Sequence, residues 1–273
     1  MPTLSERLAE RGMPGVRAQL EHPTVAGIAR GDLDPEVFRS WLEQDYLFLL
    51  DYVRVFARLA WQAPDQHLGE LVDLAHSTWH DELALHRRLA AEFDADLIGA
   101  VKGPACTAYT RFVLEAARDY GRGLAALLPC MWGYSTLGRL LAEHPPEEAR
   151  YARWVATYAD PAFAALAARC AAMLDDAHHQ GRLDEPVAVA AFDEGMRQEL
   201  AFWDVPGTES DEGSPAGGTT AGVSEEREVE RARGLAARAG RGSPAETRSV
   251  FVGPSDEGSP AGGTTAGVSE ERE

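Results

Sequence analysis

A long helix with one buried face is predicted by residues 34–60, DPEVFRSWLEQDYLFLLDYVRVFARLA. Asp34 is a favourable N-cap residue, and Pro35 takes the first helical position, where its missing N–H is not needed. Large apolar residues then recur with a period of roughly 3.6 residues. The stretch therefore predicts a helix that packs against others in a core.

The remainder of residues 1–204 has the same helical character. Ala63-Pro64-Asp65 ends the first helix and caps the next, and Gly121-Arg122-Gly123 is expected to separate two later ones. Further helices are expected near 65–93, 109–120, 124–144, 161–179 and 185–203. Strict alternation of apolar and polar residues between turns, the pattern of a strand, is absent from the sequence. The fold class expected is all-α, a compact bundle of about seven or eight helices with short connections.

Composition changes abruptly after Trp203. Residues 205–273 consist mainly of Gly, Ser, Thr, Pro and Glu, and residues 210–228 are identical to residues 255–273. A segment with so few large apolar side chains cannot offset its chain entropy, so a disordered acidic tail is expected. The 19-residue duplication indicates duplicated coding sequence, because a structural repeat needs a face to bury. The sequence thus predicts a helical domain over 1–204 and a low-complexity tail over 205–273.

The charge balance is strongly acidic. The chain has 44 Asp and Glu against 26 Lys and Arg, a net charge of −18, and Lys102 is its one lysine. Binding to nucleic acid is not expected, since phosphate neutralisation needs clustered Lys and Arg. An acidic surface with Arg in place of Lys is typical of halophile proteins, in which salt screens self-repulsion. A GC-rich genome, which favours arginine codons, is the alternative explanation.

Cysteine usage and the N-terminus bear on the compartment. Cys106, Cys130 and Cys170 form an odd, sparse set without metal-ligand spacing, which argues against a disulfide framework. The N-terminal residues lack the apolar region of a signal peptide, and no run approaches the roughly 18 apolar residues of a membrane span. A soluble, cytoplasmic protein without membrane contact is expected.

The segment LLPCMWGY, residues 127–134, contains a candidate nucleophile. Pro129 inside a helical pattern removes a backbone hydrogen bond and precedes Cys130 directly, and Tyr134 lies one helical turn further along the same face. A thiol beside a phenol fits a nucleophile next to a binding group. A buried, inert cysteine is the alternative interpretation, since free Cys packs like a small apolar residue.

Two carboxylates lie among apolar residues. Asp45 in the long helix must find a partner or shift its pKa, so it either presents its oxygens to a ligand or forms a core ion pair. Glu199 precedes Phe202 and Trp203, an environment in which an acid–base catalyst could have a raised pKa; a solvated glutamate is the alternative. Tyr109 and Tyr158, taken singly, are interpreted as core residues.

Six segments together resemble the TenA (thiaminase II) family over nearly all of residues 15–203. In chain order they are Gln-Asp at 44–45, Glu-x-x-x-His at 82–86, Tyr-Thr at 109–110, Ala-Leu-Leu-Pro-Cys-x-Trp-x-Tyr at 126–134, Trp-x-x-x-Tyr at 154–158 and Glu-x-x-Phe-Trp at 199–203. Each motif is weak alone, and their common order and spacing makes the resemblance specific.

The resemblance implies a haem oxygenase-like helical fold, usually a homotetramer, and no metal or organic cofactor. It implies hydrolysis of thiamine or of its degradation product, aminomethyl-aminopyrimidine, to hydroxymethylpyrimidine for thiamine salvage. By position, Cys130 would be the nucleophile and Glu199 the acid–base, while Asp45 would bind the pyrimidine amine and ring nitrogen. The aromatic residues implied in the substrate pocket are Phe48, Tyr109, Tyr134 and Tyr158.

The chain departs from the family pattern at two places. Phe48 stands where the family often has a tyrosine, which removes one hydroxyl contact, and the chain breaks off after Phe202-Trp203 where the family continues with a short helical end. Both departures concern the pocket or the assembly rather than the type of reaction.

Two other functions are compatible with parts of the sequence. A di-iron oxygenase on the same scaffold would use Glu82 with His86 and Asp175 with His179, but such a site needs about six carboxylate and histidine ligands. The other histidines of the Glu82 helix, and His86 itself, are better interpreted as surface or supporting groups. A regulatory protein without activity is the second alternative, and the net charge of −18 argues against contact with DNA.

Overall fold

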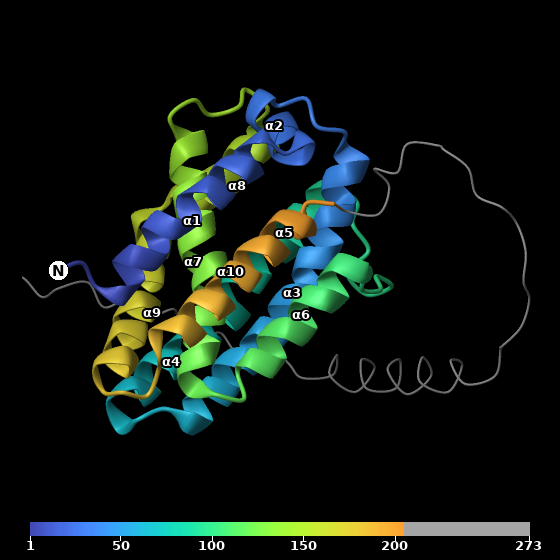
Figure 1. Ribbon diagram of the computed structural model, residues 1–273. Helices are drawn as coiled ribbons and strands as arrows, with labels where there is room; N and C mark the ends of the chain where they lie inside the picture. The colour runs from blue at the N-terminus through green and yellow to red at the C-terminus, as the bar shows by residue number, and fades with distance from the viewer. Residues whose placement is uncertain (205–273) are drawn as a thin grey trace, which may run out of the picture. The chain divides into compact units, whose positions relative to one another are not determined.

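The computed structural model describes residues 1–204, and within them the chain is an array of helices (Figure 1). The expected tail over 205–273, with its two copies of one segment, lies outside the described residues. The helices are α1 (Leu4–Glu21), α2 (Pro23–Arg30), α3 (Pro35–Gln62), α4 (Asp65–Ser77), the π-helical η1 (Thr78–Glu82), α5 (Leu83–Glu92), α6 (Pro104–Ala116), α7 (Tyr120–Ala142), α8 (Ala149–Ala159), α9 (Pro161–His179) and α10 (Glu185–Phe202). The all-α fold class is confirmed.

Helix α7 lies at the centre of the bundle. It contacts α8, α9 and α10 most extensively and also α1, α6 and α3, and most of its side chains are buried. On the other side of the bundle α3 packs against α4 and α6 (Figure 1). Because α7 is surrounded, its sequence is apolar or small on nearly every face rather than on one stripe. A polar group on α7 is therefore held in a fixed, largely dry environment.

Helix starts follow the capping signals in the sequence. The Asp34 carboxylate accepts from the Glu36 N–H at 2.9 Å, and the Asp160 carboxylate accepts from the Ala162 N–H at 2.7 Å. Each of these caps is followed by proline at the first helical position. The expected beginnings of α3 and α9 are confirmed.

The expected helix break at Gly121-Arg122-Gly123 is wrong. These residues lie in the first turns of α7, which begins after Asp119, whose side chain accepts from the Arg122 N–H at 2.8 Å. Here glycine permits close packing. A Cβ on Gly121 would lie 2.7 Å from the Leu183 Cβ, and one on Gly123 would lie 2.6 Å from a Leu59 methyl.

The stretch expected as one helix over 65–93 is interrupted in its middle by η1. There the Leu83 N–H donates to the Thr78 carbonyl five residues earlier, the wider turn of a π-helix. Such single π turns insert an extra residue and occur frequently at functional sites. None of the helices in residues 1–204 is both long and apolar enough to cross a membrane.

Candidate active site

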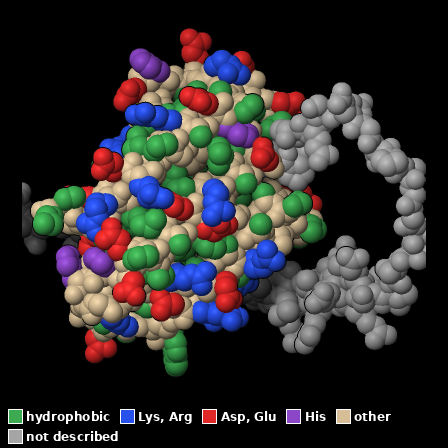
Figure 2. Space-filling view, in the orientation of Figure 1, with side chains coloured by type: hydrophobic (Ala, Val, Ile, Leu, Met, Phe, Trp, Pro, Cys, Tyr) green, Lys and Arg blue, Asp and Glu red, His purple; other side chains and the backbone are tan. Residues whose placement is uncertain are grey.

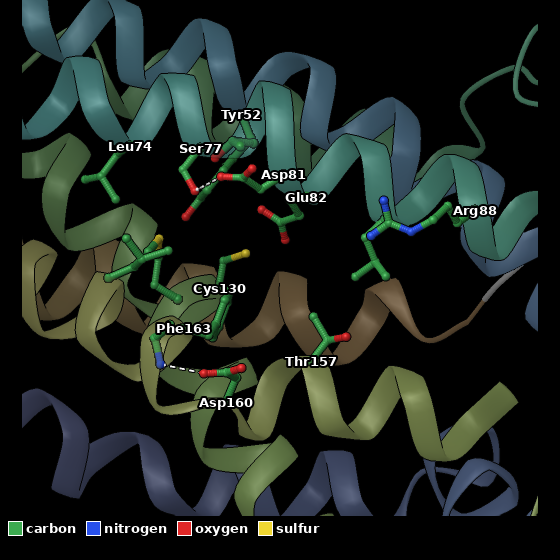
Figure 3. Close-up of a pocket in the computed structure, with 15 residues that line it drawn as sticks. Tyr52, Leu74, Ser77, Asp81, Glu82, Arg88, Cys130, Thr157, Asp160 and Phe163 are labelled. Atoms are coloured by element: carbon green, nitrogen blue, oxygen red, sulfur yellow. Dashed lines mark hydrogen bonds between the residues drawn. The ribbon is translucent and has the colours of Figure 1, made fainter. Parts of the chain in front are cut away.

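A cavity of about 360 Å³ opens between the α4–η1–α5 stretch and α7, α8 and α9 (Figure 3). Its wall combines apolar side chains with carboxyl, hydroxyl, thiol and guanidinium groups. The lining residues are Tyr52, Leu74, Ser77, Thr78, Asp81, Glu82, Leu85, Arg88, Cys130, Met131, Thr157, Asp160, Ala162, Phe163 and Leu166. The size and the mixture of groups suit a small ring-containing ligand.

The Cys130 thiol points into this cavity from α7 (Figure 3). It is partly exposed, whereas Cys106 and Cys170 are buried. The Cys106 thiol donates to the Gln44 carbonyl at 3.4 Å, and the Cys170 sulfur lies 4.0 Å from that of Met131. Of the three cysteines, Cys130 is thus the one that lines the cavity.

The surroundings of Cys130 favour the protonated thiol. Burial raises its pKa well above the usual range, and the negative charges of Glu199, Glu82 and Asp45 raise it further. A hydrogen bond with the Tyr52 hydroxyl acts in the opposite direction. A reaction that uses the thiolate must therefore remove the thiol proton to a nearby base.

Glu199 is a carboxyl close to Cys130, and it is almost completely buried at 1% exposure. The Tyr109 hydroxyl donates to its Oε1 at 2.5 Å. Burial raises the pKa of Glu199 to about 8, the charge of Asp45 adds to the effect, and hydrogen bonds with Tyr109 and Cys130 partly offset it. The carboxyl therefore titrates near neutral pH, as a group that both takes and gives protons requires.

A close contact between α7 and α10 places Glu199 beside Cys130. Gly195 lies one turn before Glu199, and a Cβ at this position would come within 2.7 Å of the Pro129 Cγ and 3.3 Å of the Ala126 carbonyl oxygen. Only a glycine lets the two helix backbones approach this far. The proline before Cys130 thus packs directly on the helix that bears Glu199.

Asp45 forms a buried pair with His86. The Asp45 Oδ2 lies 2.5 Å from the His86 Nε2, with side chains 8% and 1% exposed. The His86 Nδ1 lies 2.9 Å from the Glu82 carbonyl oxygen, so both ring nitrogens face acceptors. Burial acts to lower the pKa of His86, but the charge and hydrogen bond of Asp45 outweigh it and the pKa is raised. The pair fixes the orientation of the Asp45 carboxylate.

Tyr134 and Tyr158 lie side by side next to these groups. Their ring centroids are 4.9 Å apart, and both pack against Trp154. Burial raises both pKa values well above the usual range, and the charges of Asp45, Glu199 and Cys130 act in the same direction. The two phenols are therefore neutral hydrogen-bonding groups near all three of these residues.

The sequence matches the model of the TENA/THI-4/PQQC family over residues 15–205. The chain belongs to this family. It is 33% identical over 210 residues to a Halalkalibacterium halodurans protein named aminopyrimidine aminohydrolase, covering 72% of this chain and 92% of that one. A Helicobacter pylori protein of the same name is 31% identical over 154 residues, 54% of this chain and 71% of the relative. A solved TenA homologue from P. horikoshii OT3 superimposes with a TM-score of 0.69 at 26% identity, covering 74% and 97% of the two chains.

In this member of the TENA/THI-4/PQQC family, five of the predicted site residues form one connected group around Cys130. Hydrogen bonds or mutual charge effects join Cys130 to Glu199, Tyr109, Asp45, Tyr134 and Tyr158. Cys130 alone among them lines the open cavity, and the other five are buried. Of the two expectations for the histidines, His86 has the supporting position, buried against Asp45, whereas His76 and His80 are exposed at the surface.

Phe48 lies in the aromatic core and not in the cavity wall. It is 2% exposed, and its ring centroid lies 4.7 Å from that of Tyr109 and 5.3 Å from that of Tyr52. Its place in substrate binding stays a prediction. Through Tyr109, Phe48 supports the group that donates to Glu199.

Among the lining residues that were not predicted as site residues, Tyr52 and Glu82 carry polar groups near Cys130. Tyr52, seven residues after Asp45, shares its helix face. Its hydroxyl donates to the Leu127 carbonyl at 3.3 Å and lies close enough to Cys130 to lower the pKa of the thiol. Glu82 lies at the end of the π turn and reaches into the cavity (Figure 3). The seven-residue spacing could have indicated Tyr52. The π turn that positions Glu82 has no comparable sequence signal.

The ligand pairs weighed for a di-iron site are engaged differently. Asp175 accepts from the Ser5 N–H at 2.8 Å and from the Ser5 hydroxyl at 2.7 Å. His86 pairs with Asp45. Within residues 1–204 no group of three His, Cys, Asp or Glu side chains has an arrangement that could hold a metal ion.

Proposed function

We propose that this chain hydrolyses 4-aminopyrimidines in thiamine salvage, converting aminomethyl-aminopyrimidine, thiamine or both to hydroxymethylpyrimidine. The observation that carries the proposal is the Cys130 thiol, which lines the cavity and has the buried Glu199 carboxyl close enough to raise its pKa. The names of the relatives in Halalkalibacterium halodurans and Helicobacter pylori support the reaction class. The buried position of Glu199, which raises its pKa to about 8, supports its part in proton transfer.

Asp45 is the proposed partner of the pyrimidine. A carboxylate held by a cationic histidine can accept from the exocyclic amine of a 4-aminopyrimidine and from a protonated ring nitrogen. Tyr109, Tyr134 and Tyr158 would hold the ring by aromatic packing, with Phe48 behind Tyr109. Their side chains would also exclude bulk water from the reacting atoms.

The proposed chemistry begins with the proton on Cys130. Glu199 takes the thiol proton and passes it to a pyrimidine ring nitrogen, which makes the ring electrophilic. The thiolate sulfur then bonds to a ring carbon, and the ring electrons move to expel the leaving group from the exocyclic methylene. Water bonds to that methylene and gives up one proton, which balances the proton that leaves with ammonia or, with thiamine, passes to solvent. The carbon–sulfur bond breaks, and the ring proton returns through Glu199 to the Cys130 thiolate. No metal or organic cofactor is required.

Product formation tests the proposal. The purified full-length chain is incubated separately with aminomethyl-aminopyrimidine and with thiamine, and hydroxymethylpyrimidine is quantified by chromatography. We expect its enzyme-dependent release from at least one substrate, together with ammonia or free thiazole. Absence of the product from both reactions would contradict the proposed function.

The exposed apolar face of α4 and η1 supports a homo-oligomer, which we propose to be a homotetramer. Leu68, Val72 and Trp79 are exposed and spaced by four and seven residues, so they lie on one helix face. Exposed apolar residues grouped on one face mark contact surfaces.

We propose a cytoplasmic protein with an acidic, halophile-like surface and no nucleic-acid partner. The net charge of −18 supports this proposal. On the face that Figure 2 draws, acidic and basic side chains are interspersed rather than gathered by sign.

A further inference from the structure

The two carboxyl groups nearest Cys130 occupy different environments. Glu199 lies behind the cavity at 1% exposure and is not among the lining residues. Glu82 is partly exposed and lines the cavity itself, on the wall that faces Cys130 (Figure 3). A group that departs from a bound substrate must leave through the open cavity. It therefore passes the side on which Glu82 lies.

The Glu82 carboxyl is not committed to a structural interaction. The backbone carbonyl of Glu82 accepts from His86. Its carboxyl has no hydrogen bond from residues 1–204 among the causes of its pKa, which are burial and the charges of His86 and Asp45. Burial raises the pKa of Glu82 to about 7, the charge of Asp45 adds to this effect, and that of His86 opposes it. Near neutral pH Glu82 thus holds a proton much of the time.

Glu199 has no proton left for the leaving group. In the proposed reaction it takes the thiol proton and gives it to the ring nitrogen, and the Tyr109 hydroxyl already donates to its Oε1. Tyr52 is bound to the Leu127 carbonyl, and its pKa is raised well above the usual range, so it is a poor proton donor. The leaving amine needs a separate acid.

We infer that Glu82 is the acid that serves the leaving amine, a role that rests on the proposed function. Before the carbon–nitrogen bond breaks, one proton lies between Glu82 and the substrate amine. When the bond breaks, its electron pair and this proton stay on the nitrogen, and ammonia departs. Glu82 is left as a carboxylate. Water then bonds to the methylene and gives a proton to Glu82, the carbon–sulfur bond breaks to release the Cys130 thiolate, and the ring proton returns through Glu199 to that sulfur. Every group ends as it began.

Thiamine makes this inference testable, because its leaving group differs. The thiazolium ring is already a cation and departs as a neutral thiazole, with the electron pair of the broken bond and no added proton. The addition of water is common to both substrates. Proton transfer to the leaving group is required with the amine alone, so a larger loss with the amine than with thiamine reports on that step.

The experiment compares Glu82→Gln with the unaltered chain on both substrates. Glutamine matches the shape of the protonated carboxyl but cannot transfer a proton. We expect kcat for aminomethyl-aminopyrimidine to fall about 100-fold, within the usual range for loss of a general acid. The fall with thiamine should be at least tenfold smaller. Glu92→Gln, the same change at an exposed glutamate that pairs with Arg153, should leave both rates within about twofold.

An equal loss with both substrates, or no loss with the amine, would overturn the role of Glu82 and leave the proposed function standing. An unaltered chain that hydrolyses neither substrate would overturn both. Circular dichroism and thermal melting establish that each variant is folded. Should Glu82→Gln not fold, Glu82→Asp is compared in the same way, and the same selective loss with the amine is expected because the acid is drawn back from the cavity.

Discussion

The His86 Nε2 and the Asp45 Oδ2 lie 2.5 Å apart in the core, and the other ring nitrogen of His86 faces the Glu82 carbonyl oxygen. One histidine thereby connects the proposed pyrimidine-binding carboxylate on α3 to the residue on η1 that lines the cavity. The pair joins the two sides of the site. Its loss should affect both stability and substrate binding.

His86→Ala should destabilise the fold and weaken substrate binding. Removing one partner leaves the Asp45 carboxylate buried without its counter-charge, which costs about 3–5 kcal/mol in comparable pairs. We expect a lower melting temperature and, in the fraction that folds, a KM raised at least tenfold with a smaller change in kcat. An unchanged KM would show that Asp45 needs no support from His86 to bind the ring.

Stability should decrease as pH rises through the neutral range. The pKa of Glu199 is raised to about 8 and that of Glu82 to about 7, so the folded chain holds protons that the unfolded chain has released above about 4.5. The folded state therefore loses stability between pH 4.5 and 8 as these groups ionise. The raised pKa of His86 acts in the same direction above about pH 6.5.

Glu199→Gln distinguishes the contribution of Glu199 to the pH dependence of stability from its proposed part in catalysis. The variant should lose nearly all activity because it cannot transfer a proton, yet still bind the pyrimidine because the shape is kept. Chemical denaturation at several pH values should give a free energy of unfolding that falls less steeply with pH than in the unaltered chain. A variant with the same pH dependence would show that Glu199 titrates normally in the fold.

Adding one methyl group at Gly195 should increase the distance between α7 and α10. In Gly195→Ala the new Cβ would lie 2.7 Å from the rigid Pro129 ring and 3.3 Å from the Ala126 carbonyl oxygen. The helices must separate, which costs about 1–3 kcal/mol and moves Glu199 away from Cys130. We expect a lower melting temperature and a fall in kcat of at least tenfold. Gly69→Ala, at an open position on α4, is the matched control; it should leave kcat unchanged and should not lower the melting temperature, because alanine favours the helix.

Much of the fold and part of the site follow from local sequence signals. The caps at Asp34 and Asp160 fix the starts of two helices, because capping depends on neighbouring residues alone. The glycines near the start of α7 were misinterpreted as a break, because their use is close packing against Leu183 and Leu59, which are distant in sequence. Likewise, the π turn that aims Glu82 into the cavity depends on tertiary packing.

The three cysteines provide the central test of the proposed mechanism. Cys130→Ser should abolish hydrolysis, whereas Cys106→Ser and Cys170→Ser should keep most of it. Serine preserves the shape, but its alkoxide is far less available near neutral pH than a thiolate. Cys130 lines the cavity near the Glu199 carboxyl, whose charge raises the pKa of the thiol, whereas Cys106 donates to a backbone carbonyl and Cys170 packs against Met131.

Initial rates of aminopyrimidine hydrolysis by the three cysteine variants test whether Cys130 is the nucleophile. Circular dichroism establishes that each variant is folded. Burial of a new hydroxyl at Cys106 or Cys170 should lower stability by about 1–3 kcal/mol without changing the reacting groups. Those two variants therefore serve as controls for folding as well as for activity. A folded Cys130→Ser protein that retains more than about a tenth of the wild-type rate would contradict covalent catalysis. The reaction would then have to proceed by direct attack of water, with Glu199 as its base.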